Sequence, residues 1–304
     1  MRYVKYLIDQ VRKQTENEEV TDFTGIQDSE FLQYLNDAQH NLQALITQQC
    51  PDVFTSESII QAVSGQERYE LPSDCYLNNK IVNVEYSATG NDDDFYVIEQ
   101  DILKRRVPGV SSAPLRYIRQ DGNILLTPQP QSSGKIRVTY IKRIRELDLR
   151  RATITSVPTI SNSSSWYINL EEVNVEALSE DEYICIVDKK GRTIVKNLLV
   201  KNVSDSRITL EPHTSIEEDL DIQIGHYIVG GEDSSTHGDF DRSVERYMIA
   251  YCAWKILKRD SSMDSNEAST ELNSMAQEIV KSYAAISDDV SLVPELNSWD
   301  DWSY

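Results

Sequence analysis

The hydrophobic pattern of this chain changes period twice, and this change limits the folds that it can adopt. Residues 2–14 and 28–50 carry apolar residues at helical spacing. Residues 56–230 instead contain short runs of β-branched and aromatic residues, separated by turns rich in glycine, serine and aspartate. Helical spacing returns at residues 241–256 and 268–286. The sequence therefore predicts helices at both ends and strands between them.

The clearest helix covers residues 28–50. Asp28 is a suitable N-cap, and Pro51 ends the pattern. The apolar positions recur every three or four residues: Phe31, Leu35, Ala38, Leu42 and Leu45. Such a helix needs partners for its apolar face, and the C-terminal helices are the ones that the sequence offers.

The strand-rich middle divides into two blocks, at about 56–145 and 152–230. The second has closely spaced strands without helices, and residues 188–192 form a credible hairpin turn. We expect a small β-barrel or sandwich there. The predicted fold is α+β, a helical bundle core with β-rich excursions, with these expected parts: helices at 1–55, a β-rich region at 56–150, an inserted barrel at 151–232, helices at 233–286 and an extended acidic tail at 287–304.

The net charge of −20 is unevenly distributed. Residues 101–151 hold 12 Lys and Arg against 4 Asp and Glu, while the rest of the chain holds 18 against 46. The acidic part repels nucleic acid, and the basic segment either meets an acidic partner or is a solvated sheet face. The acidity itself suits either solubility or the wall of a DNA conduit, because it would repel phosphate.

No catalytic or metal-binding motif stands out. The four cysteines and four histidines are scattered, and nucleotide-binding and hydrolase motifs are missing. Asp92, Asp93 and Asp94 predict a solvated turn more than a cation site. His237, Asp239 and Asp241 alternate before a helix, but Asp241 is better explained as a helix cap. We therefore expect no enzyme, metal or cofactor, and no membrane segment.

One turn, "GQERYELPSD" at residues 65–74, has no catalytic counterpart. Gly65 permits a tight turn, and Pro72 ends the strand that follows. Tyr69 and Leu71 lie two residues apart and face the same side of that strand.

Three stretches resemble the portal-adaptor proteins of short-tailed bacteriophages (podoviruses), also called head-to-tail connector or head-completion proteins. They lie in the helix at 28–50, in the turn at 65–74 and in a strand pair at 123–142. The matching residues are Leu35, Asn36 and Ala38; Gly65, Gln66, Tyr69, Leu71, Pro72 and Asp74; and Ile124, Leu126, Pro128, Pro130, Gly134, Ile136, Val138 and Tyr140. The second β block makes the chain similar to a longer relative, such as the ring proteins of crAss-like phages.

The resemblance implies a virion structural protein at the head–tail interface, present in the host cytoplasm during assembly. Such adaptors form a ring, expected to be a dodecamer, under the portal protein. The ring extends the DNA channel and docks downstream tail or ring proteins. Genomic DNA would pass through the lumen without specific binding during ejection.

Two segments are candidate partner interfaces. The basic stretch is expected to meet an acidic surface of a neighbouring copy or of the portal, through Lys142, Arg143, Arg145, Arg150 and Arg151. The acidic tail carries Trp299 and Trp302, which are aromatic anchors that can order on a partner.

Two other classes of protein remain open. The second β block is compatible with a glycan- or oligonucleotide-binding barrel, which would need exposed aromatic residues such as Tyr183 and Tyr227. A cell-wall hydrolase would need a pair of carboxylates in a cleft.

Overall fold

The structure is a computed structural model, and the chain divides into two compact units that are described separately here. Unit 1 contains residues 1–45 and 144–281, and unit 2 contains residues 46–143 and 282–304. The described residues are 3–15, 26–91, 94–102, 113–156, 159–161, 165–171, 178–204, 206–211, 221–259 and 265–291.

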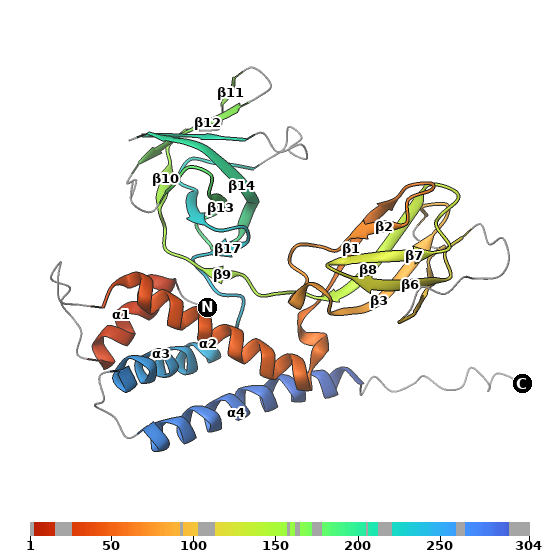
Figure 1. The fold of residues 1–304 in the computed structure, drawn as a ribbon. Helices are drawn as coiled ribbons and strands as arrows, with labels where there is room; N and C mark the ends of the chain where they lie inside the picture. The colour runs from red at the N-terminus through yellow and green to blue at the C-terminus, as the bar shows by residue number, and fades with distance from the viewer. Residues whose placement is uncertain are drawn as a thin grey trace, which may run out of the picture. The chain divides into compact units, whose positions relative to one another are not determined.

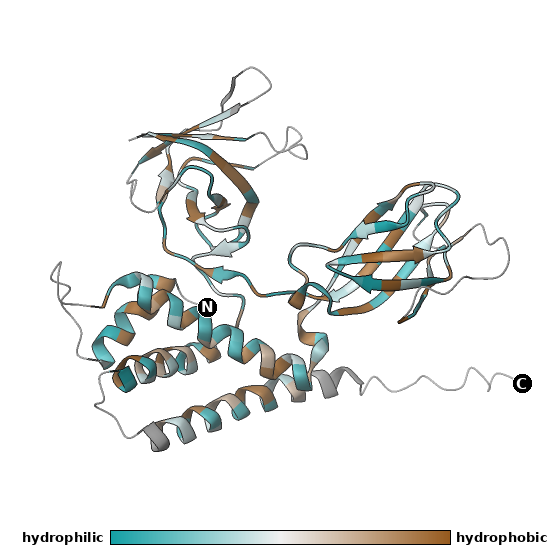
Figure 2. Ribbon diagram, in the orientation of Figure 1, coloured by the Kyte–Doolittle hydropathy of each residue, from teal (hydrophilic) through white to brown (hydrophobic). Residues whose placement is uncertain are grey.

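The predicted helices are present at both ends of the chain (Figure 1). They are α1 (Val4–Gln14), α2 (Asp28–Gln49), α3 (Glu245–Arg259) and α4 (Ser265–Ser291). Hydrophobic and hydrophilic residues alternate along α2 (Figure 2), as its spacing predicted. Phe31 of α2 contacts two other helices, because Arg12 of α1 lies over its ring and Cys252 Sγ of α3 lies 3.8 Å from its carbonyl oxygen. Helices α1 and α2 from the N-terminal part thus pack with α3 from the C-terminal part.

The buried face of α2 differs slightly from the predicted one, and α4 has a buried face of its own. In α2, Ile46 is fully buried and Leu45 only partly, since Ile46 lies four residues after Leu42 on the same face. In α4 the buried residues are spaced by four: Ala268, Leu272, Ala276 and Val280. Asp28 is the first residue of α2 and not a cap before it, and its carboxylate binds Lys5 and Arg12.

Six strands of the second β block close into a barrel, which confirms the α+β fold with an inserted barrel. Their order is β10–β16–β13–β14–β15–β12, and β12 pairs again with β10. The strands are β10 (Ala152–Ile154), β12 (Ser165–Glu171), β13 (Tyr183–Val187), β14 (Thr193–Ser204), β15 (Arg207–Leu210) and β16 (Tyr227–Gly230), and β11 (Thr159–Ser161) pairs with β12 outside the ring. The turn at 188–192 joins β13 to β14, as predicted.

The barrel is connected to the rest of unit 1 by two short strands. β9 (Glu146–Leu147) leads into the barrel and β17 (Ser234–Ser235) leads out of it. The two strands pair in parallel, with Ser234 beside Glu146 and Ser235 beside Leu147. We call this pair the neck.

Unit 2 contains two antiparallel-rich sheets of four strands each, ordered β1–β8–β3–β4 and β2–β7–β6–β5. Apolar residues from both sheets form one buried cluster, so that the sheets share a core. The strands are β1 (Thr55–Ala62), β2 (Arg68–Glu70), β3 (Ile81–Ser87), β4 (Tyr96–Val97), β5 (Glu99–Gln100), β6 (Arg116–Gln120), β7 (Asn123–Thr127) and β8 (Gly134–Ile141).

Helix α4 extends beyond residue 286, where the sequence predicted that the helices end, and residues 292–304 lie outside the described part of the chain. α4 continues to Ser291, because no glycine or proline interrupts the chain before Pro294. Trp299 and Trp302 lie outside the described residues. Among the helices that the structure describes, none is long and apolar enough to cross a membrane.

Candidate functional site

The neck of the barrel is anchored to α2 by the asparagine of the first family motif. Asn36 Nδ2 donates to the carbonyl oxygen of Leu147 at 3.0 Å, and Leu147 N donates to Asn36 Oδ1 at 2.8 Å. Leu35 and Ala38 of the same motif are fully buried in the helical core. The motif therefore combines a core face with a polar side chain that fixes β9.

Gln39, which the apolar spacing of the helix did not predict as a functional residue, extends this anchor. Its Nε2 donates to Asn36 Oδ1 at 2.8 Å and to the carbonyl oxygen of Arg145 at 2.9 Å, and the residue is fully buried. Gln43, one turn later, is also buried and accepts a hydrogen bond from Ile144 N. The sequence places both glutamines on the apolar face of this helix. Because buried amide groups need hydrogen-bond partners, this placement indicates a polar contact there.

Arg145 joins three parts of unit 1 at the neck. Its Nε donates to Asp239 Oδ1 at 2.7 Å, and a second guanidinium nitrogen lies 2.6 Å from the same oxygen. Its remaining nitrogen donates to Gly191 O and Thr193 Oγ1 at 3.0 and 2.9 Å. The segment before α3, the β13–β14 turn and β9 are thus held by one side chain.

Arg151 also joins separate segments of unit 1, at the start of the barrel. It lies 2.9 Å from Asp148 and 2.6 Å from Glu182. Asp148 also accepts a hydrogen bond from Gly230 N at 2.6 Å. Burial raises the pKa of Asp148, and the contacts with Arg151 and Gly230 oppose that shift.

The five basic residues expected at a partner interface differ in exposure and in their contacts. Arg145 and Arg151 are 17% and 19% exposed and are engaged within the chain. Lys142 Nζ lies 3.9 Å from Asp74 Oδ2 in unit 2. Arg143 is half-buried and Arg150 is exposed. The count of charges in the sequence missed most of their acidic partners because Asp74, Glu182 and Asp239 are distant in the chain, whereas Asp148 lies three residues before Arg151.

The second and third family motifs meet in unit 2. Gly65 adopts a positive φ of 79°, as its turn required, and its N–H donates to the carbonyl oxygen of Pro130 at 2.8 Å. Tyr69 of β2 pairs with Ile124 of β7. Gln66 donates to Arg68 O, Pro128 follows a cis peptide bond, and a Cβ at Gly134 would collide with Ser87 O. Tyr69 and the inward residues of the third motif lie in one core cluster, against which Leu71 packs.

Asp74, at the end of the second motif, is bound by a tyrosine of the third. Tyr140 Oη donates to Asp74 Oδ1 at 2.8 Å, and both residues are buried. The Asp74 carbonyl oxygen accepts from Arg143 N at 2.6 Å. Burial and the neighbouring carboxylate raise the pKa of Tyr140, so that it stays a hydrogen-bond donor. The motif after Pro72 thus fastens the end of β8.

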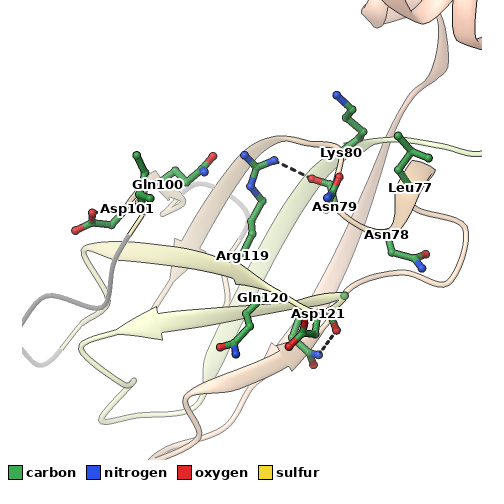
Figure 3. Close-up of a pocket in the computed structure, with 12 residues that line it drawn as sticks. Leu77, Asn78, Asn79, Lys80, Gln100, Asp101, Arg119, Gln120 and Asp121 are labelled. Atoms are coloured by element: carbon green, nitrogen blue, oxygen red, sulfur yellow. Dashed lines mark hydrogen bonds between the residues drawn. The ribbon is translucent and has the colours of Figure 1, made fainter.

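A polar hollow of about 700 Å³ lies beside this turn (Figure 3). Arg119 reaches across it and donates to the carbonyl oxygen of Asn79 at 2.8 Å. Leu77 and Asn78, on its border, have positive φ angles of 51° and 54°. Leu77 is 63% exposed, so that this turn presents an apolar side chain at the border of the hollow.

The residues considered as metal ligands have other roles. His237 packs on the ring of Tyr3, and burial lowers its pKa. Asp239 binds Arg145, and Asp241 accepts a hydrogen bond from Ser243 N, as a helix cap does. Asp92 and Asp93 lie outside the described residues. Within the described part of the chain, no three His, Cys, Asp or Glu side chains gather as a metal site would require.

The two aromatic residues considered for ligand binding on the barrel do not form a shared surface. Tyr183 is 39% exposed, but Tyr227 is buried and shares a hydrogen bond with Thr236 at 2.5 Å. Burial raises the pKa of Tyr227. The stacking surface that a glycan or oligonucleotide would need is therefore not built from this pair.

Comparison with known proteins agrees with the motifs. A search of curated proteins found no match. The family model described as SU10 adaptor protein matches residues 4–178, more than half of the 304 residues. This range includes α1, α2, the strands of unit 2 and the barrel strands through β12. The chain therefore belongs to the SU10 adaptor protein family and is a structural adaptor protein of a bacteriophage particle.

Proposed function

We propose that this adaptor forms a ring between the portal and the tail of the particle, and that the ring extends the DNA channel. The observation that carries the proposal is the family match over residues 4–178. The ring would be a dodecamer of a short-tailed phage, with the portal above it and tail or ring proteins below. The proposal extends to a longer ring protein of the crAss-like type, in which the closed barrel would be the inserted module.

The proposed domain limits follow from this role. Residues 1–55, 56–150 and 233–286 would form the adaptor core, and residues 151–232 would be the inserted module. The protein would act by assembly and not by catalysis. The net charge of −20 would let DNA pass through the lumen without adhering to it.

Two surfaces are proposed to bind the partners. In the basic stretch, Arg143 and Arg150 are the residues to test, because Arg145 holds the neck and Arg151 holds the start of the barrel. Charge reversal at Arg143 and Arg150 is expected to weaken assembly without unfolding the protein. The second surface is the tail, with Trp299 and Trp302 as anchors. Removal of residues 292–304, after the end of α4, is expected to lower portal binding.

The deciding experiment is cryo-electron microscopy of the purified chain mixed with the portal protein of the same phage. A ring of this chain stacked on the portal is the expected result. Absence of a complex, with both proteins shown to be folded by circular dichroism, would contradict the proposed role. The free chain alone is not the test, because the ring is proposed to form on the portal.

A further inference from the structure

The two ends of strand β13 carry opposite charge. The turn before it contains Glu180 and Asp181, and the turn after it contains Lys189, Lys190 and Arg192. The strand has five residues, which separates the turns by about 17 Å at 3.3 Å per residue. The barrel therefore presents an acidic end and a basic end along one strand.

The acidic end projects from the barrel. Glu180 and Asp181 are exposed, and Asp181 has a positive φ of 63°. Glu182, the next acid, is turned toward Arg151, whereas Asp181 has no side-chain partner among the described residues. Tyr183 follows directly and is 39% exposed. We call Glu180, Asp181 and Tyr183 the acidic tip.

The basic end is hollowed. Lys189, Lys190, Arg192, Ile224 and His226 line a cavity of about 370 Å³ together with Asp188 and Gln223. Ile224 is 63% exposed, so the hollow offers an apolar contact next to its charges. We call Lys189, Lys190, Arg192 and Ile224 the basic hollow.

The negative residues near the basic hollow are already engaged. Asp188 accepts hydrogen bonds from Lys190 N and Arg192 N, both at 2.8 Å, and lies 3.4 Å from Arg192 Nε. Asp221 accepts from Gln223 Nε2 at 2.5 Å. Asp188 thus supports the turn that presents the basic side chains outward.

Among the residues that the structure describes, other lysines of the barrel have acidic partners, whereas Lys189 and Lys190 do not. Lys196 lies 3.4 Å from Asp233, and Lys201 lies 3.1 Å from Glu211. The ammonium groups of Lys189 and Lys190 have no acidic partner among the residues that the structure describes. In a chain with 50 acidic residues, two neighbouring lysines without such a partner mark a place for an external carboxylate.

We propose that the barrels of neighbouring copies dock end to end, with the acidic tip of one copy in the basic hollow of the next. This inference rests on the proposed ring. The charges are complementary, and Tyr183 would cover Ile224 where each is exposed. Two different surfaces on one subunit give a heterologous contact, which repeats around a closed ring. The inserted barrel would then be a second belt of subunit contacts.

The test uses the full chain assembled on the portal, with charge-reversal variants at each end. Lys189→Glu with Lys190→Glu, and separately Glu180→Lys with Asp181→Lys, should each raise the concentration needed for ring formation about tenfold at 0.15 M salt. The combination of all four substitutions should restore assembly, because the two ends match again. A matched control is Lys13→Glu with Lys281→Glu, which makes the same charge change at exposed helix positions.

A cross-link separates this proposal from the ring itself. All four native cysteines are buried, so Glu180→Cys with Lys190→Cys adds the only thiols expected to react with a short bismaleimide. A ladder of covalent multimers is the expected product. A ring on the portal without a ladder, or charge reversals that leave assembly unchanged, would overturn barrel docking but keep the proposed function. A ladder without a portal ring would support barrel docking and overturn the portal role.

The proposal would also be overturned if the variant with all four substitutions failed to regain assembly, provided that its unfolding curve matches that of the wild type. The two ends would then matter for reasons other than contact with each other. Equal weakening by the control pair would assign the effect to net charge and would likewise overturn it.

Discussion

Asn36 and Leu147 exchange two hydrogen bonds, as two paired backbone amides would. The asparagine side chain is both donor and acceptor, so that it binds the N–H and the carbonyl oxygen of Leu147 as a second neighbouring strand of β9 would. Because Gln39 binds the carbonyl oxygen of Arg145, α2 holds both Arg145 and Leu147 where the chain leaves the helical core. The position of the barrel in unit 1 thus depends on a few amide groups.

Replacement of Asn36 should loosen this attachment. Asn36→Ala removes both hydrogen bonds and leaves Leu147 N and O without their partner, which should lower the free energy of unfolding by about 2 kcal/mol. Urea unfolding measured by circular dichroism would show the change. Asn41→Ala is the control, because Asn41 is on the same helix and makes one exposed hydrogen bond to Tyr251. An equal loss in both variants would contradict the role assigned to Asn36.

Arg145 should stabilise the chain more than Arg143 does. Arg145→Ala leaves Asp239 without its guanidinium and frees Gly191 O and Thr193 Oγ1, which should cost about 3 kcal/mol. Faster hydrogen exchange is expected at β9 and β17 in particular. Arg143→Ala should cost less than about 1 kcal/mol. Unchanged exchange at the neck in Arg145→Ala would refute this assignment.

Tyr140 should remain protonated for as long as unit 2 is folded. Its raised pKa contributes stability below the ordinary tyrosine value of 10.0, and that contribution is lost as the pH rises above it. Absorbance at 295 nm should show its ionisation only together with unfolding. Tyr140→Phe should cost about 1.5 kcal/mol near pH 7, because buried Asp74 loses a donor. Adding Asp74→Asn should cost less than the sum of the single changes.

Acid should weaken the attachment of α1 to α2. Burial disfavours ionisation of Asp28, but hydrogen bonds from Lys5 and Arg12 outweigh it and lower its pKa. The resulting stability is present above the ordinary value of 3.8 and is lost as the pH falls below it. Asp28→Asn should therefore cost about 1 kcal/mol at pH 7, with a difference from wild type that shrinks below pH 4. A pH-independent difference would contradict this account.

The native cysteines should resist thiol reagents. All four are buried, and burial raises the pKa of Cys252 to about 12. Ellman's reagent should find almost no reactive thiol in the folded protein near pH 8 and four after denaturation. Cys252→Ala, with unchanged slow reaction of the others, would serve as the control. Rapid reaction of one thiol in the folded chain would show an opening that the packing does not predict.

The parts that the sequence predicted well are those with a repeating local pattern. The apolar face of α2 has a helical period, and residues 188–192 have the composition of a hairpin turn. The adaptor motifs were recognised in sequence, but their function in the fold was not. Gly65 and Pro130 are distant in sequence, and their hydrogen bond becomes visible only in the sheet.

The neck was missed because it has no periodic signal. β9 and β17 have two residues each, too few to show strand alternation. Arg145 looked like part of an exposed basic patch because its partner, Asp239, follows 94 residues later. The net charge of a segment counts its basic side chains, but only the fold shows which of them already contact an acidic side chain.

The parallel pairing of β9 with β17 brings together the two points where the chain leaves and rejoins the helical core. Neighbouring strands are about 4.8 Å apart, so that a few residues would suffice to bridge the gap. Any module whose own ends meet could be spliced in at this place without disturbing α1 to α3. The barrel could therefore be exchanged between adaptors, which would change the surface that the adaptor presents while the helical core keeps its fold.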